Sequence, residues 1–541
     1  MAQTIIDTRA PQMFPALSPA EIERLRRFGT ERRFAAGESV MRAGEIGHGL
    51  VVVLAGEVRV TRRDERGHDQ PIVTHGPGAF MGELAQLSGR PALVDAMALS
   101  EVQALVLPPE KLRAMMIAEA EVGERIMRAL ILRRVGLLEG GVGPVIVGRA
   151  ADGDVLRLES FLTRNGHPYQ RLDPDNPEDA RALEDRLGVH PAQLPIVLCP
   201  GGQILRNPGE GELARCLGLV GPLDPTRTYD VAIVGAGPAG LAAAVYAGSE
   251  GLSALVLDCR AFGGQAGASA RIENYLGFPT GISGMALMGR AYSQAQKFGV
   301  ELAIPDAATR LEGRGPDGRF HLQVGRDEQV SARAVVLASG ARYRKLNVTD
   351  LEAYEAASIH YWASPLEAKL CSGQEVALVG AGNSAGQAVV YLASQVAKVW
   401  LLVRGGGLEA SMSRYLVDRI RGLSNVELVT GAQVTALEGK DGVLSAIRWR
   451  ADGEDVRRPV GHLFLFIGAE PNTDWLAGSG VDLDAKGFVT TGARTPLETS
   501  RPGVFAIGDV RAGSVKRVAS AVGEGAQVVA ALHGYLAEAE T

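Results

Sequence analysis

Two glycine-rich turns are the residues whose types and spacing could hold a diphosphate. The first reads Gly235-x-Gly237-x-x-Gly240, and the second reads Gly380-x-Gly382-x-x-Ala385. In such a turn the first glycine allows the bend, the second lets a pyrophosphate approach the backbone, and the third small residue lets a helix pack on the preceding strand. The free N–H groups at the start of that helix then face the phosphates. Each turn predicts a dinucleotide site, and a glycine turn without a ligand is the alternative.

The two turns belong to an internal repeat. Residues 230–242 (DVAIVGAGPAGLA) match residues 375–387 (EVALVGAGNSAGQ) without a gap, at an offset of 145. Each copy is predicted to be a buried strand, a turn and a helix, followed by a second apolar strand. One such motif alone is weak evidence, whereas two in matching contexts are strong. The repeat therefore predicts two dinucleotide-binding folds.

The ends of the second strands distinguish the two sites. In the first copy the strand at 254–257 ends at Asp258, an acid suited to accept hydrogen bonds from ribose hydroxyls. The second copy has Val403 followed by Arg404. An arginine can bind a 2′-phosphate that an acid would repel. This difference favours NADPH over NADH at the second site, and a solvated strand-end cation is the alternative for Arg404.

The composition indicates a globular protein of several domains. The chain has 541 residues, is 46% hydrophobic and 22% charged, and carries a net charge of -6. This charge gives no case for nucleic-acid or membrane partners. The uncharged run at 231–249 is broken by glycines and a proline, so it predicts a strand, a turn and a helix instead of a membrane span.

The start of the chain and the cysteines indicate a cytoplasmic protein without a metal site. No apolar core of an export signal is visible in the first 14 residues. The cysteines have neither C-x-x-C spacing nor a zinc-like cluster, which favours a reducing compartment. They are Cys199, Cys216, Cys259 and Cys371.

Three patterns follow one another along the chain. Residues 1–140 combine β-rich runs and glycine turns with a helical stretch at 119–138, which predicts a β-roll. Residues 143–222 alternate short strands and helices, and end in a proline-rich linker. Residues 228–541 are α/β throughout. The predicted fold class is multidomain α/β, with two nested three-layer Rossmann-type folds after a β-roll and a small α/β domain.

Five further segments of the C-terminal part match a known family. They are GGQ at 263–265, IENYLGFP at 272–279, VVLASG at 335–340, FIGAEPNT at 466–473 and VFAIGDV at 504–510. Together with the repeat, they resemble the low-molecular-weight thioredoxin reductase family of flavoproteins over nearly all of residues 228–541. The resemblance implies an FAD domain split into 228–345 and 462–541, an NAD(P)H domain at 346–461 between them, and a homodimer.

The resemblance, together with the glycine turns, assigns site residues for two cofactors. The residues expected to bind FAD are Gly235, Gly237, Pro238, Ala239, Gly240, Asp258, Gly264, Gln265, Asn274, Gly340, Gly508, Asp509, Arg517 and Val518. The residues expected to bind NADPH are Gly380, Gly382, Asn383, Ser384, Ala385 and Arg404. The family's basic cluster after the second strand is reduced here to Val403-Arg404-Gly405.

The family's redox-active C-x-x-C is absent. Counting back from Gln374 places Ala363-Ser364-Pro365-Leu366 at the motif, followed by Glu367. A dithiol is needed to pass electrons from flavin to a protein disulfide by exchange, so the electron acceptor is left open. Glu367 is the candidate catalytic residue, a proton donor near the flavin, and a surface carboxylate is the alternative.

Residues 34–98 resemble a cyclic-nucleotide-binding domain. The motif is Phe80-Met81-Gly82-Glu83-Leu84-Ala85, followed by Arg90-Pro91-Ala92. The resemblance implies that backbone N–H groups and the arginine hold a cyclic phosphate while the glutamate accepts from the ribose. The implied ligand residues are Gly82, Glu83, Leu84, Arg90 and Ala92. A scaffold that has lost its ligand is the alternative.

Residues 143–220 resemble a thioredoxin or glutaredoxin fold. Leu194-Pro195 resembles the family's cis-proline before a central strand. Gly148-Arg149-Ala150-Ala151 occupies the place of the C-x-x-C. We therefore expect this domain to be redox-inactive and to serve docking or spacing.

Three functions agree with these patterns. The first is an NAD(P)H-dependent FAD oxidoreductase, regulated by a cyclic nucleotide, that reduces a redox protein or a small molecule. The second is a regulatory flavoprotein with little turnover, which responds to a cyclic nucleotide and to redox state. The third is a disulfide reductase that uses Cys371 or a partner's thiols.

Overall fold

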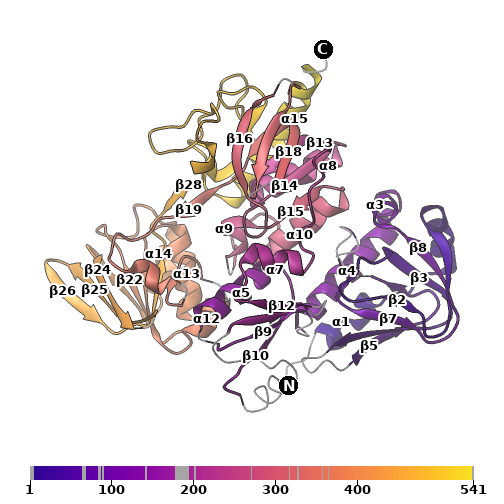
Figure 1. Ribbon diagram of the computed structural model, residues 1–541. Helices are drawn as coiled ribbons and strands as arrows, with labels where there is room; N and C mark the ends of the chain where they lie inside the picture. The colour runs from indigo at the N-terminus through magenta and orange to yellow at the C-terminus, as the bar shows by residue number, and fades with distance from the viewer. Residues whose placement is uncertain are drawn as a thin grey trace.

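The computed structural model describes most of the chain, as an indigo-to-purple β-roll, a small central α/β unit, and two larger α/β folds (Figure 1). The described residues are 5–63, 69–82, 87, 91–139, 143–150, 152–176, 194–199, 203–269, 271–315, 317–325, 328–355, 357–363, 365–440 and 442–538. The predicted multidomain α/β class is confirmed. In this described part, no helix combines the length and the apolar character needed to span a membrane.

The N-terminal β-roll consists of two four-stranded antiparallel sheets flanked by helices. The sheets have the orders β1-β8-β3-β6 and β2-β7-β4-β5, and their inner faces bury Phe34 and Phe80 completely. The strands are β1 (Thr30–Phe34), β2 (Ser39–Met41), β3 (Leu50–Ala55), β4 (Val58–Arg63), β5 (Asp69–His75), β6 (Phe80–Met81), β7 (Asp95–Ala98) and β8 (Val102–Leu107). The helices are α1 (Ile5–Met13), α2 (Pro19–Leu25), α3 (Pro109–Ala118) and α4 (Ala120–Glu139).

The small α/β unit has one four-stranded sheet of order β10-β9-β11-β12, in which β9 and β10 are parallel and β11 is antiparallel to both neighbours. The Leu194–Pro195 peptide bond before β11 is cis, as the resemblance implied. The elements are β9 (Val145–Val147), α5 (Gly153–Arg164), β10 (Gln170–Leu172), β11 (Ile196–Leu198), β12 (Ile204–Arg206) and α7 (Glu210–Cys216).

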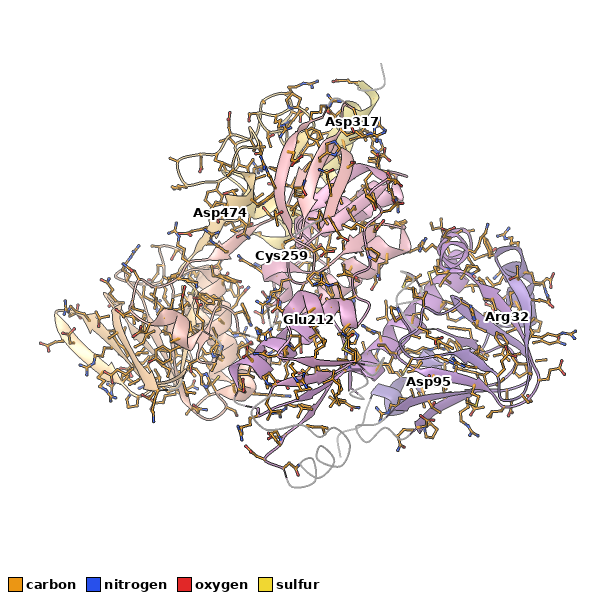
Figure 2. The ribbon with its side chains drawn as sticks, viewed as in Figure 1. Arg32, Asp95, Glu212, Cys259, Asp317 and Asp474 are labelled. Atoms are coloured by element: carbon orange, nitrogen blue, oxygen red, sulfur yellow. A yellow bond between two sulfur atoms is a disulfide. The ribbon has the colours of Figure 1, made fainter. Side chains whose placement is uncertain are left out.

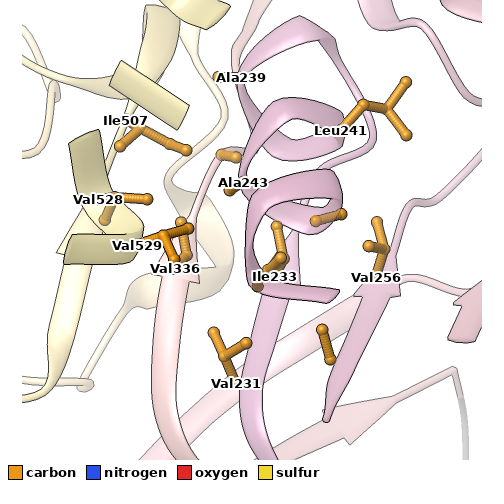
Figure 3. Close-up of a cluster of buried hydrophobic side chains, with 14 of the residues drawn as sticks. Val231, Ile233, Ala239, Leu241, Ala243, Val256, Val336, Ile507, Val528 and Val529 are labelled. Carbon is orange, nitrogen blue, oxygen red and sulfur yellow. The ribbon is translucent and has the colours of Figure 1, made fainter. Parts of the chain in front are cut away.

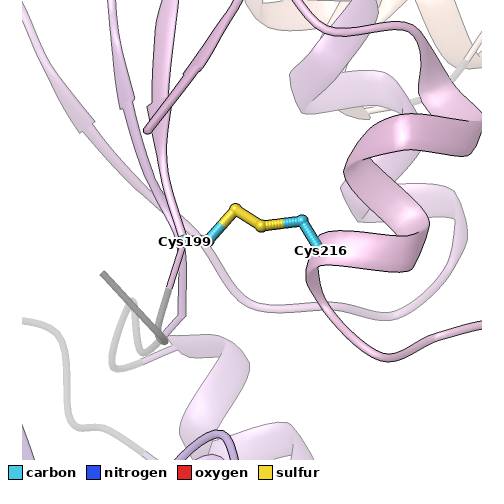
Figure 4. Close-up of a disulfide and its surroundings, with 2 residues drawn as sticks. All are labelled: Cys199 and Cys216. Atoms are coloured by element: carbon cyan, nitrogen blue, oxygen red, sulfur yellow. A yellow bond between two sulfur atoms is a disulfide. The ribbon is translucent and has the colours of Figure 1, made fainter. Parts of the chain in front are cut away.

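A disulfide joins the sheet of this unit to its last helix (Figure 4). Cys199 follows β11 and Cys216 ends α7, and their α-carbons lie 6.3 Å apart. The two cysteines are 17 residues apart, so their spacing gave no signal for the pair. The unit lacks a C-x-x-C but nevertheless contains a disulfide, and Cys259 and Cys371 are thiols.

The first Rossmann-type fold is a seven-stranded sheet of order β15-β14-β13-β18-β17-β16, with β29 beside β18. Strands β13, β14, β15, β18 and β29 are parallel where they pair. Helices cover the sheet, and accordingly β14 and the second half of β13, residues 231–234, are apolar and buried. Its elements are β13 (Thr228–Val234), α8 (Pro238–Ser249), β14 (Ala254–Leu257), α9 (Gly264–Gly267), α10 (Gly284–Lys297), β15 (Glu301–Ala303), β16 (Ala308–Arg314), β17 (Phe320–Val324), β18 (Glu328–Leu337), β29 (Val504–Ala506) and α15 (Val518–Glu538).

Helices α8 and α15 pack side by side on one face of this sheet (Figure 3). Val231, Ile233 and Val336 of the sheet and Val528 of α15 are fully buried there. Gly525 lets the two helices approach closely, because a Cβ at Gly525 would lie 2.6 Å from the Ala239 carbonyl oxygen. The C-terminal helix thereby covers the first glycine turn.

The second Rossmann-type fold lies between β18 and β29 in the chain. Its five-stranded parallel sheet has the order β20-β27-β21-β22-β23, next to a three-stranded antiparallel sheet β24-β25-β26. The short strands β19 (Ala341–Tyr343) and β28 (Ala469–Pro471) pair where the chain enters and leaves. The elements are α11 (Leu351–Tyr354), β20 (Ile359–His360), α12 (Pro365–Leu370), β21 (Glu375–Val379), α13 (Asn383–Ala393), β22 (Lys398–Leu402), α14 (Arg414–Arg421), β23 (Val426–Val429), β24 (Gln433–Lys440), β25 (Val443–Ala451), β26 (Glu454–Arg458) and β27 (His462–Leu465).

One buried carboxylate of the first fold predicts a pH-dependent stability. Asp306 is 9% exposed, and burial, followed by the charge of Glu328, raises its pKa from 3.8 to about 6. Since the folded state holds the proton more tightly than the unfolded state, the charged form costs stability as pH rises from about 4 to about 7. We expect Asp306→Asn to raise the free energy of unfolding at neutral pH by up to about 3 kcal/mol, and to have no such effect near pH 4.

Chemical denaturation at several pH values measures this difference, and Asp317→Asn is the control. The backbone N–H of Arg319 lowers the pKa of the exposed Asp317, so this control is expected to give no stabilisation at neutral pH. An Asp306→Asn effect that grows on acidification would contradict the assignment.

Candidate functional site

The first glycine turn connects the end of β13 to the start of α8, and two of its glycines are required by the fold itself. Gly235 has φ +117°, and a Cβ there would lie 2.0 Å from the Ala338 carbonyl oxygen. A Cβ at Gly240 would lie 1.8 Å from the Gly235 carbonyl oxygen. No side chain fits at either position, so these glycines shape the turn and bring α8 onto the sheet.

Gly237 differs from these two, because the fold itself does not need a glycine there. Its φ of -74° and ψ of -175° suit any residue. A Cβ would have as its nearest neighbour the α-carbon of Gly264, 4.0 Å away. The open space lies beside the first turn of α8, which Pro238 and Ala239 begin, where unpaired N–H groups favour an anion. The crevice therefore fits the diphosphate of a dinucleotide.

Two further turns border this crevice. Gly263 and Gly264 both have positive φ, and Gln265 donates from its amide nitrogen to the Ala341 carbonyl oxygen. Gly340, with φ +65°, precedes Ala341. Residues 263–265 are thus hydrogen-bonded to the start of β19, and Gly264 lies opposite Gly237 in the crevice.

Asp258 follows β14 and lies against the first glycine turn. Its Oδ2 accepts the Ala236 N–H at 2.8 Å, and its Oδ1 accepts the Arg260 N–H at 3.1 Å. Burial raises the pKa of this carboxyl group, although these N–H donors act in the opposite direction. The carboxylate links the end of β14 to the glycine turn and lies where the sequence predicts a ribose.

After the second fold the chain returns to the first sheet through β29, and the residues that follow, Gly508 and Asp509, lie against the start of α8. A Cβ at Gly508 would lie 2.9 Å from the Cβ of Ala239. Asp509 is half-buried, and burial, opposed by Lys516, raises its pKa. Val518 begins α15 shortly afterwards. The structure therefore brings residues about 270 positions apart to one crevice, as the resemblance implied.

Two expected FAD residues have exposed side chains. Asn274 is exposed, and in the described part of the chain no hydrogen bond links it to the crevice. Its neighbour Glu273 forms an ion pair with Arg419 of the second fold at 3.2 Å, a contact between positions far apart in the chain. Arg517 is also exposed, and its backbone N–H donates to the Val515 carbonyl oxygen at 2.8 Å.

The second glycine turn, like the first, contains both a glycine that the fold requires and a glycine that it does not require. A Cβ at Gly380 would lie 2.6 Å from the Phe466 carbonyl oxygen, and Ala385 is fully buried behind it. Gly382 has φ -87° and ψ 178°, and a Cβ there would meet nothing within 4 Å. The space beside the first turn of α13 therefore fits a second diphosphate.

Polar groups border the second crevice. The Asn383 Oδ1 accepts the Ser413 N–H at 2.6 Å, which fixes the loop before α14. Ser384 and Arg404 are exposed, whereas Val403 is buried. Arg404 forms no hydrogen bond or ion pair with the residues that the structure describes, so its guanidinium is available to a ligand at this strand end.

The segment that replaces the C-x-x-C contains a buried acid. Glu367 is 5% exposed, and its Oε1 accepts the Trp362 Nε1–H at 2.8 Å. The alternative that Glu367 is a surface carboxylate is therefore wrong, because α12 turns this side chain toward the indole. Trp362 was not among the predicted site residues, since a tryptophan carries no motif at this position.

Cys371 lies behind the same helix and is completely buried. Its Sγ donates to the Glu367 carbonyl oxygen at 3.0 Å. Burial raises the pKa of this thiol to about 11, so the nucleophilic thiolate is disfavoured at neutral pH.

Two of the residues predicted to bind a cyclic nucleotide, Gly82 and Ala92, lie in the described part of the β-roll. Gly82 has φ +144° and its carbonyl oxygen accepts from Arg133 of α4 at 2.9 Å, while the Ala92 N–H donates to the Glu45 carbonyl oxygen at 2.9 Å. The predicted residues Glu83, Leu84 and Arg90 lie outside the described residues. The buried Arg133 links the predicted phosphate loop to α4, a contact that the motif alone did not reveal.

Comparison with known proteins gives two family matches. Residues 229–525 match the family described as pyridine nucleotide-disulphide oxidoreductase, and residues 31–119 match the cyclic nucleotide-binding domain. The chain is similar to an alkyl hydroperoxide reductase subunit, that from Escherichia coli, with 31% identity over 59% of this chain and 60% of that protein. The chain thus spans about three-fifths of the length of that relative.

Two further similarities cover nearly whole proteins. The thioredoxin reductase of Mycolicibacterium smegmatis is 33% identical over 57% of this chain and 97% of its own length. The crystal structure of Lactococcus lactis thioredoxin reductase aligns with a TM-score of 0.54 and 27% identity, over 57% of this chain and 99% of that one. Thioredoxin reductase family proteins use FAD and NADPH, and both crevices fit such cofactors. The chain belongs to the pyridine nucleotide-disulphide oxidoreductase family.

Proposed function

We propose that this protein oxidises NADPH and passes the electrons, by way of FAD, to an acceptor that it reaches without a C-x-x-C of its own. FAD is held by residues 228–345 and 462–541, and NADPH by residues 346–461. The single observation that carries the proposal is the open space in front of Gly237 and Gly382, two glycines that the fold does not require. A ligand that approaches the backbone at both turns accounts for that space.

The chain's own residues bind and orient the two cofactors. FAD held in the first crevice would supply the redox chemistry that links the nicotinamide coenzyme to the acceptor. Gly237, Asp258 and Asp509 hold the FAD, and Gly382 and Arg404 hold the NADPH. The first turns of α8 and α13 contribute their unpaired N–H groups to the two diphosphates.

The acceptor is the part of the proposal in which this chain departs from its relatives. Ala363 and Leu366 stand where the resemblance places two cysteines. The buried Glu367, which accepts a hydrogen bond from Trp362, is the polar side chain that this segment presents instead of a dithiol. A quinone, a dye-like small molecule or a redox protein with its own thiols therefore fits as acceptor.

An acceptor screen tests this proposal. The full chain with FAD is supplied with NADPH or NADH and with quinones, dyes and protein disulfides in turn. We expect NADPH-dependent reduction of at least one acceptor that requires no dithiol in the enzyme. Rapid reduction of thioredoxin disulfide as the sole activity would contradict the proposed acceptor class.

The buried thiol predicts the outcome of a cysteine replacement. Because Cys371 is protonated and enclosed, we expect Cys371→Ser to leave NADPH oxidation, and reduction of any disulfide substrate, within about twofold of the wild type. Cys259→Ser, at an exposed thiol, is the matched control. A loss of disulfide reduction confined to Cys371→Ser would instead make this chain a reductase with an unusual thiol.

The exposed guanidinium at the second crevice predicts a change of coenzyme preference. Charge-assisted hydrogen bonds contribute about 1.5 to 3 kcal/mol, so Arg404→Gln is expected to lower the NADPH:NADH ratio of kcat/KM by roughly 10- to 100-fold. Steady-state kinetics with both coenzymes measure the ratio. Arg450→Gln, at an exposed arginine of β25 that pairs with Asp455, is the control and is expected to leave the ratio unchanged.

Regulation by a cyclic nucleotide is the second function that an observation favours. Arg134 of α4 donates from Nε to the Gly166 carbonyl oxygen at 3.0 Å, which connects the β-roll to the end of α5. Gly218, just after α7, packs against Pro91. These two contacts between the N-terminal domain and the small α/β unit support the proposal that cyclic-nucleotide binding alters the rest of the protein. Addition of cyclic AMP or cyclic GMP during the acceptor screen tests this, with a change in rate as the expected result.

A further inference from the structure

An arginine of the small α/β unit reaches the FAD crevice from outside the FAD fold. Arg164 is the last residue of α5, and its Nη2 donates to the Gly264 carbonyl oxygen at 3.2 Å. The α-carbon of Gly264 is the nearest neighbour of the open position at Gly237. The guanidinium therefore lies beside the turn that faces the diphosphate space.

The surroundings of this guanidinium are those of a cofactor site. Its central carbon lies 5.3 Å from the centroid of the Trp362 ring, which belongs to the segment that replaces the C-x-x-C. Burial, followed by the charge of Arg260, lowers the pKa of Arg164, and Asp258 and Tyr343 act in the opposite direction. The charge of Arg164 thus interacts with Asp258, which the sequence predicts to bind the FAD ribose.

The Arg164 guanidinium makes no direct contact with an anionic group of the described residues. Among the residues that the structure describes, no carboxylate lies within 4.0 Å of it, and its one hydrogen bond goes to a neutral carbonyl. A cation removed from water is costly unless an anion and hydrogen bonds compensate it. The forked N–H groups of an arginine match phosphate oxygens, and a dinucleotide diphosphate supplies two negative charges.

We propose that Arg164 is a ligand of the FAD diphosphate, contributed by the small α/β unit. The unit without a C-x-x-C thereby completes the flavin site. This inference rests on the first crevice being the FAD site.

Neighbouring contacts also hold the small unit against the first fold. The Asn165 Nδ2 donates to the Arg260 carbonyl oxygen at 3.1 Å. Arg260 forms an ion pair with Glu210 of α7 at 3.2 Å, in the region that Cys259 and Glu212 mark in Figure 2. These contacts provide variants that disturb the docking of the unit and leave Arg164 intact.

The test compares Arg164→Gln, Arg164→Lys and Asn165→Ala in the full chain. Glutamine keeps a polar side chain but removes the charge, whereas lysine keeps the charge. The dissociation constant of FAD is measured from the flavin fluorescence released on dilution of the holoprotein. We expect Arg164→Gln to weaken FAD binding by about 10- to 100-fold, with Arg164→Lys recovering most of the loss. Asn165→Ala is expected to bind FAD as the wild type does.

Two results overturn the inference. One is an Arg164→Gln protein that binds FAD as tightly as the wild type, or that changes the KM for NADPH instead. The other is an equal loss of FAD affinity in Asn165→Ala, which would assign the effect to docking. A wild-type protein that does not bind FAD would contradict the proposed function itself and is distinguished in the same titration.

Discussion

Replacing Gly237 with valine is expected to give a folded protein whose affinity for FAD has fallen by at least about 100-fold, or roughly 3 kcal/mol. The backbone at Gly237 has φ and ψ values that valine adopts, and the nearest atom to a Cβ lies 4.0 Å away. Since neither the backbone conformation nor the Cβ is strained there, we expect the loss to arise from the diphosphate, which can no longer approach the backbone. Flavin absorbance per protein and the thermal unfolding of the apoprotein measure the two parts of this expectation.

Gly209→Val is the matched control. Gly209 also precedes a helix, has φ -66° and ψ 157°, and has nothing within 4 Å of a Cβ, but it lies outside both crevices. We expect this variant to keep its FAD. A Gly237→Val protein as yellow as the control would show that the first crevice holds no diphosphate.

The second large effect is expected at the equivalent glycine of the repeat. Gly382→Val should keep FAD and fold normally, because a Cβ there meets nothing within 4 Å. We expect the rate of flavin reduction by NADPH at a fixed, subsaturating concentration to fall by at least about 100-fold, since the side chain fills the space of the second diphosphate. Stopped-flow absorbance under anaerobic conditions measures this rate.

The two valine variants distinguish the cofactors from each other. Gly237→Val is expected to lose FAD, whereas Gly382→Val is expected to retain FAD and lose only its reduction. Loss of FAD from Gly382→Val, or rapid reduction in that variant, would refute the assignment of NADPH to the second crevice.

The parts of the fold that depend on local requirements could be predicted from the sequence. Gly235 and Gly240 must be glycines because backbone atoms lie within 2.0 Å of any Cβ. This requirement produces the same spacing wherever a strand, a turn and a helix pack in this way. The repeat at Gly380 indicated the second fold for the same reason. The cis Leu194–Pro195 bond was likewise visible as a motif.

The parts that depend on contacts between distant segments could not be predicted. Glu367 is buried because α12 brings it to Trp362. Arg164 meets Gly264 across 100 positions, and no motif marks a lone arginine at a helix end. Cys199 and Cys216 pair because β11 and α7 end at the same place, a fact of packing and not of spacing.

The resemblance and the structure differ on the side chain of Asn274. The resemblance assigned Asn274 to the flavin site, whereas the structure leaves its side chain exposed and uses the neighbouring Glu273 to contact Arg419. A motif gives the place of a residue in the chain, but the orientation of its side chain depends on the facing element. The role of Asn274 stays a prediction.

The pairing of FAD with NADPH is tested by anaerobic titration of the purified full chain with NADPH. We expect a yellow protein whose flavin absorbance bleaches as NADPH is added, with a stoichiometry of about one NADPH per FAD. A colourless protein that FAD does not reconstitute, or a flavin band that neither NADPH nor NADH bleaches at equilibrium, would contradict it.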